Sequence, residues 1–221
     1  MERPLGNRRR QRRVGHFMVR CVALLGVLAA IMSGVPRATS AAEPSKAAPQ
    51  NRFEHVHALT MDADGQTLWL GAHTGLFRSQ DRGKTWTGVA LPVTHAHLDV
   101  MAVAGDPRDA KVLYVGTHEA GVFRTRDGGL TWTVVNAGLK GPDVHGLAVD
   151  PREPLKLHAA VRGPGEGVYR TTDGGEKWVR VDDGPAGEVK VLASVNIPTG
   201  MGGIFLYGGT GEGLLRSPDC F

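Results

Sequence analysis

The chain has 221 residues, which is enough for one domain with a buried core, and its formal net charge is +4. Residues 1–41 hold eight arginines and one glutamate, so the rest of the chain keeps 18 basic and 21 acidic side chains. This near-neutral balance gives no support for nucleic-acid binding. Cys21 lies in the first segment and Cys220 is alone after it, which excludes an intramolecular disulfide in the remaining chain.

Residues 1–41 have the organisation of a secretory signal peptide, which predicts an exported protein, either periplasmic or secreted. A basic segment at 8–13 precedes an uncharged apolar run at 22–35, and small residues follow at 38–42. The run is shorter than the roughly 20 residues of a membrane span, although an uncleaved N-terminal anchor stays an alternative. Arg12 and Arg13 leave twin-arginine export open beside the general secretory route. Residues 42–52 are predicted to be a flexible leader.

The remainder, residues 53–221, contains four similar units, each of which begins with two strand-like runs separated by Asp, Pro or Gly turn residues. In chain order these runs are Val56–Met61 and Thr67–Gly71, Val100–Ala104 and Val112–Gly116, Val144–Val149 and Leu155–Val161, and Val189–Val195 and Ile204–Tyr207.

Each unit continues with a predicted hairpin that carries the pattern S/T-x-D-x-G-x-T-W or a close variant, and its aspartate recurs every 46 residues. Third strands are expected at 75–78, 121–124 and 167–170, and fourth strands at 85–89, 131–135 and 177–181. The residues of the pattern are Ser79, Asp81, Gly83, Thr85, Trp86, Thr125, Asp127, Gly129, Thr131, Trp132, Thr171, Asp173, Gly175, Trp178, Ser217 and Asp219.

The residue types in this pattern predict a folding role rather than catalysis. The aspartate can accept backbone hydrogen bonds within its own turn, the glycine suits a positive φ, and the tryptophan can cover the hairpin with a large apolar surface.

Four short strands in a unit of about 46 residues have the size of a β-propeller blade. The sequence therefore predicts an all-β propeller of four-stranded blades, with three full blades and a fourth that stops inside its hairpin. Because closed propellers have whole blades, we expect an open arc with an exposed final edge, and a chain that is a piece of a larger propeller.

A ligand face is expected at the end of the blades opposite the repeated hairpin turns, because the links between blades and the turns between second and third strands meet there. Histidines are concentrated in these segments. The predicted face consists of His55, His57, His73, His95, His97, His118, His145 and Arg162.

Three interpretations of these histidines stay open. His55, His57, His95 and His97 form two pairs at period two, as metal ligands on one side of a strand would, so they are weak candidates for a divalent metal. The imidazoles can instead contact a polar ligand or peptide, or they can be satisfied by water and backbone. We expect no other cofactor.

The repeated pattern resembles the Asp-box of BNR-repeat β-propellers. Segments 117–124 and 144–151 are similar to bacterial exported proteins often labelled glycosyl-hydrolase-like. The resemblance implies wider relatives that include sialidases, xyloglucan-processing glycosidases, sortilin-type receptors and photosystem II assembly propellers, whose chemistry differs although the blade is shared.

A glycosidase would need two carboxylates about 5–9.5 Å apart. The weak candidates are Asp99, Glu119, Asp143 and Glu166, with Glu212 beside them, and their spacing selects no pair. The resulting hypothesis is an exported, monomeric module that binds a protein or glycan in the cell envelope, with a glycosidase-like hydrolase and a metal-binding surface as alternatives.

Overall fold

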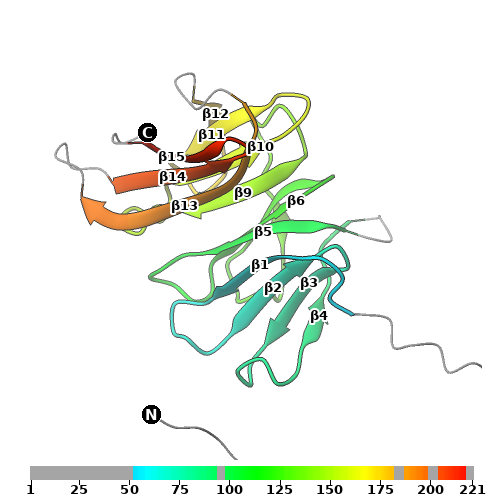
Figure 1. The fold of residues 1–221 in the computed structure, drawn as a ribbon. Coiled ribbons are helices and arrows are strands. Elements are labelled where there is room, and N and C mark those ends of the chain that lie inside the picture. Colours follow the sequence, from blue (N-terminus) through cyan, green and yellow to red (C-terminus); the bar gives the residue numbers. More distant parts are fainter. Residues whose placement is uncertain (1–51, 94–97, 182–186, 199–203, 218–221) are drawn as a thin grey trace, which may run out of the picture. The chain divides into compact units, whose positions relative to one another are not determined.

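In the computed structural model, the described residues are 52–93, 98–181, 187–198 and 204–217, and they form only β-strands and turns (Figure 1). The predicted signal peptide, most of the leader, His95, His97 and Asp219 lie outside these residues. Within them, no helix is long and apolar enough to cross a bilayer.

The strands form three four-stranded sheets and a last sheet with three described strands, each with its strands in chain order and antiparallel. In chain order they are β1 (Val56–Met61), β2 (Leu68–Ala72), β3 (Gly75–Ser79) and β4 (Thr87–Val89); β5 (Val100–Gly105), β6 (Leu113–Thr117), β7 (Gly121–Thr125) and β8 (Thr133–Val134); β9 (Val144–Val149), β10 (Leu157–Val161), β11 (Gly167–Thr171) and β12 (Val179–Arg180); β13 (Val189–Pro198), β14 (Ile204–Thr210) and β15 (Gly213–Ser217). The predicted blades are confirmed, and the fold is a β-propeller.

The aspartate of each repeated hairpin joins the two ends of its turn. In the second sheet, Asp127 accepts hydrogen bonds from the Thr125 hydroxyl (2.7 Å) and from the Thr131 amide (2.9 Å). The Thr125 hydroxyl oxygen in turn accepts from the Gly129 amide (2.9 Å), and Gly129 has a φ of 82°. The first and third hairpins repeat these contacts around Asp81 and Asp173.

The sequence predicts that the repeated tryptophans cover their own hairpins. Two of them also contact the neighbouring sheet. Trp132 packs edge-on against Trp69 of the first sheet, with ring centroids 6.3 Å apart. Trp178 is buried and its indole N–H donates to the Val135 carbonyl, 2.7 Å away, after the last strand of the second sheet. The repeated turn therefore stabilises the junction between sheets as well as its own hairpin.

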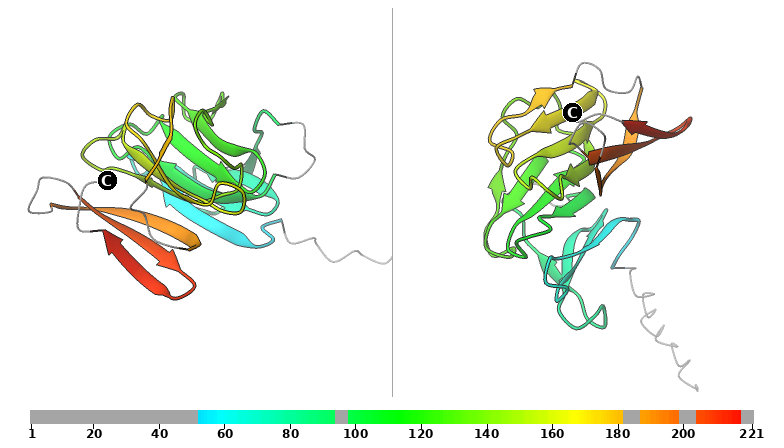
Figure 2. Two further views of the ribbon diagram at one scale, coloured as in Figure 1. Left: turned by 90° about the horizontal axis from the view of Figure 1, so that it is seen from above. Right: turned by 90° about the vertical axis from the view of Figure 1, so that its left-hand side faces the viewer.

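The sheets are stacked through their first strands, since β1 packs near β5, β5 near β9 and β9 near β13. No comparably extensive contact joins β13–β15 to β1–β4 within the described ranges, so the propeller is an open arc. On β1, Val56, Leu59 and Met61 are about half exposed or more. Figure 2 shows β15 as the outer strand of the last sheet, where Leu214 is 73% exposed.

Candidate functional site

The same β-bulge occurs in the first strand of all four sheets. At the same place in each strand, one residue has no partner in the register with the second strand; these residues are His57, Met101, His145 and Lys190. β13 has a further irregularity between Val195 and Pro198. A bulge adds a residue to one strand and redirects its side chain, and such irregularities are frequent beside functional sites. The four positions lie at the end of the sheets opposite the repeated hairpin turns.

Glycines in the second strands allow the next sheet to approach closely at this end. A Cβ atom at Gly71 would lie 2.6 Å from Cγ1 of Val100 and 2.9 Å from its carbonyl oxygen. A Cβ at Gly116 would meet Val144 in the same way, at 2.9 and 3.0 Å. In these two sheets, the residue after the second strand is thereby placed beside the residue before the next sheet's first strand.

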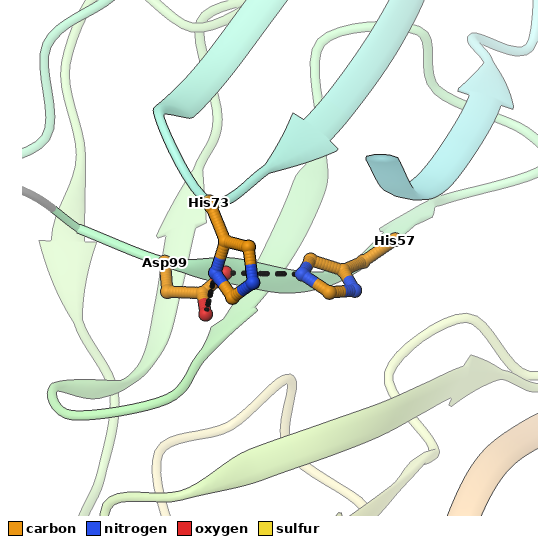
Figure 3. Close-up of side chains that lie close together, drawn as sticks. All are labelled: His57, His73 and Asp99. Carbon is orange, nitrogen blue, oxygen red and sulfur yellow. Dashed lines mark ion pairs between the residues drawn. The ribbon is translucent and has the colours of Figure 1, made fainter. Parts of the chain in front are cut away.

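We number the junctions between successive sheets in chain order. The first junction, between the first and second sheets, brings together His57, His73 and Asp99, which Figure 3 shows converging from three segments. Nδ1 of His73 contacts Oδ2 of Asp99, and Nε2 of His57 lies 3.4 Å from its Oδ1. Oδ1 of Asp99 is buried and has no hydrogen bond of good geometry within the described part of the chain. His55 is outside this trio, although its ring packs against that of His73 at 4.8 Å.

The second and third junctions form one continuous network. His118 and His145 both face Asp143, with nitrogen–oxygen distances of 3.9 and 2.8 Å. Arg162 Nη1 lies 3.1 Å from Nε2 of His145, and its Nε pairs with Glu188 of the last sheet at 2.6 Å. All three junctions therefore place a basic side chain after a second strand against a carboxylate of the next sheet.

Burial lowers the pKa of both bulge histidines, His57 and His145. For His57, the negative charge of Asp99 opposes this effect of burial and the nearby histidines add to it. For His145, Asp143 opposes the effect and the Arg162 guanidinium adds to it. Both imidazoles are accordingly predicted to be neutral at pH 7, when their ring nitrogens can accept hydrogen bonds or bind a metal.

We call the set His57, His73, Asp99, His118, Asp143, His145, Arg162 and Glu188 the histidine face. The sequence points to every member except Glu188, and it does not single out the bulge positions Met101 and Lys190. Their recurrence at steps of 44 or 45 residues was the available signal. Of the catalytic candidates, Asp99 and Asp143 are held by histidines, whereas Glu119 and Glu166 are exposed.

No protein-family model matches the chain, and no curated protein matches it either. Solved structures do match, and the three described next are 17%, 17% and 18% identical to this chain. An ancestral GH74 enzyme has a TM-score of 0.58 over 76% of this chain and 23% of its own. The extracellular domain of the one component system BT4673 of B. thetaiotaomicron has a TM-score of 0.53 over 73% and 21%. YCF48 bound to D1 peptide also scores 0.53, over 73% and 48%.

These similarities show the fold alone: they are all to propellers. This chain spans about a quarter of the GH74 enzyme and about half of YCF48.

Proposed function

We propose that the chain is an exported binding module that takes a protein or glycan partner on the histidine face. This proposal rests on one repeated observation. At all three junctions, a basic side chain is paired with a carboxylate of the next sheet. These groups are held in fixed positions by the strands, and several keep partial exposure, such as His73 at 45% and Arg162 at 35% of the side chain. A row of oriented, partly exposed donors and acceptors suits a polar ligand.

The comparisons support this proposal at the level of the fold. The neighbours include extracellular domains of bacterial proteins and a propeller bound to a peptide. Export by the segment 1–41 is part of the proposal and rests on its signal-like composition.

The glycosidase alternative draws support from the GH74 neighbours. Each histidine–carboxylate cluster, however, contains one carboxylate and two histidines. A glycosidase needs two carboxylates, one as the general acid and the other as the nucleophile or general base. Incubation with plant and bacterial polysaccharides should release no reducing ends. Release that disappears in Asp99→Asn or Asp143→Asn would favour the enzyme instead.

The binding proposal is tested by capture from a cell-envelope extract in parallel with a glycan array. The variants Glu188→Gln and Asp143→Asn should each weaken capture. Arg162 would lose the charge of Glu188 that orients it, and His118 would lose that of Asp143. The matched control is Lys84→Gln, an exposed change on a repeated hairpin turn. Equal capture by all variants, or a loss confined to Lys84→Gln, would contradict binding at the histidine face.

A further inference from the structure

The first junction has the donor atoms of a transition-metal site. One ligand atom each from His57, His73 and Asp99 lies within 4.8 Å of the others. Two ligands of a tetrahedral ion with bonds of about 2.0–2.1 Å are about 3.3 Å apart. The 3.4 Å between Nε2 of His57 and Oδ1 of Asp99 matches this separation, without the alignment of a direct hydrogen bond.

The second cluster has similar residues but a different electrostatic environment. Nε2 of His145, the atom that faces Asp143, lies 3.1 Å from a guanidinium nitrogen of Arg162. Arginine stays charged at all ordinary pH values, so the guanidinium repels a second cation at this nitrogen. No arginine or lysine is paired with the first trio in the described ranges, where Asp99 faces two imidazoles.

We infer that His57, His73 and Asp99 bind one divalent transition-metal ion of the zinc type, with solvent completing its coordination. Two imidazoles and one carboxylate suit zinc and similar ions, whereas Ca²⁺ and Mg²⁺ prefer oxygen ligands. The side chain of His73 is 45% exposed, which leaves a path for entry. This inference stands on the trio alone and does not require the proposed partner.

The ion would join two sheets. His57 and His73 belong to the first sheet and Asp99 precedes the first strand of the second, so binding stabilises their junction. An ion that binds only the folded chain must also raise its unfolding temperature.

The test is calorimetric titration of Zn²⁺ into the full chain, prepared without a histidine tag, together with thermal unfolding. We expect one Zn²⁺ per chain, a raised unfolding temperature, and no comparable effect of Ca²⁺ or Mg²⁺. His73→Gln and Asp99→Asn should each weaken binding by at least about tenfold. Because His73 is half-exposed, its replacement should leave the unfolding temperature of the metal-free chain nearly unchanged.

Two control variants separate this site from other histidines. His118→Gln, the equivalent change at the second junction, should retain full Zn²⁺ affinity, and so should a His95→Ala/His97→Ala double variant. The inference is overturned if Zn²⁺ fails to bind, if His73→Gln binds it normally, or if binding depends on His118, His95 or His97. If Zn²⁺ fails to bind the unaltered chain but that chain still captures its partner, the metal site fails while the proposed function stays in place.

Discussion

At the scale of single residues, the aspartates of the repeated hairpins accept the hydrogen bonds that join the two ends of each turn. Hydrogen bonds, first from the side chain of the threonine four residues later, lower the pKa of Asp81 and Asp127 to about 2. The folded-state pKa is therefore below the unfolded value near 3.8. The resulting stability is present above pH 4 and is lost as the pH falls towards 2.

An Asp81→Asn/Asp127→Asn double variant should accordingly have a lower urea midpoint than the parent at pH 7. Its midpoint should also decrease less steeply than that of the parent as the pH is lowered to 2. Urea unfolding followed from pH 7 to pH 2 measures both effects. Parallel curves for the two proteins would show that these carboxylates do not hold their turns.

His158 on β10 provides a second pH dependence, in a different range. Burial, with smaller effects of Lys156 and Arg170, lowers its pKa to about 4, while Asp150 acts in the opposite direction. The unfolded chain therefore binds the proton more readily, and stability should fall by about 3 kcal/mol as the pH drops from 6.5 to 4. His158→Leu should remove this part of the acid dependence; an unchanged slope between pH 6.5 and 4 would contradict it.

At the scale of elements, the close approach of adjacent sheets depends on glycine in the second strand. A methyl group at Gly71 would overlap Val100 of β5, including its carbonyl oxygen, so the strands must separate. Gly71→Ala should cost about 1–3 kcal/mol and displace Asp99 from His73. Gly105→Ala is the control, since its Cβ would have no neighbour closer than 3.9 Å; denaturation of both variants measures the difference. Equal stabilities would mean that the sheets are not packed this closely.

The sequence predicts the strands and repeated turns well because both depend on local chemistry. The fourth strands predicted from the sequence are too long. Thr131 belongs to the turn, where its amide donates a hydrogen bond to Asp127, and β8 begins only at Thr133. The pairing of Arg162 with Glu188 could not be predicted, because it depends on how far one sheet stands from the next. The bulge positions left only one signal in the sequence, their recurrence along the chain. The spacing of the histidines points to metal ligands that are neighbours on one strand, His55 with His57 and His95 with His97. The trio of His57, His73 and Asp99 instead comes from three different segments.

At the scale of the whole molecule, the arc leaves an apolar face uncovered. In the third sheet, Val144, Leu147 and Val149 are buried, but Leu59 and Met61, at equivalent positions of β1, are 63% and 55% exposed. Burial of such surface drives association.

We expect the chain to associate at high concentration through this face, contrary to a strictly monomeric state. A Leu59→Lys/Met61→Lys variant should sediment as a smaller species in velocity centrifugation. Leu130→Lys, at an exposed position on a hairpin turn, should not change the association. A parent chain that stays monomeric at every concentration would contradict the expectation.

The first two junctions of the histidine face depend on sheets that meet at glycines, which places His73 and His118 against carboxylates of the next sheet. Nuclear Overhauser contacts between the Gly71 Hα protons and a Val100 methyl group, and between Gly116 Hα and a Val144 methyl, test this most directly. We predict strong contacts at both junctions. Their absence from spectra that show the expected contacts within each sheet would contradict the stacking, and with it the histidine face.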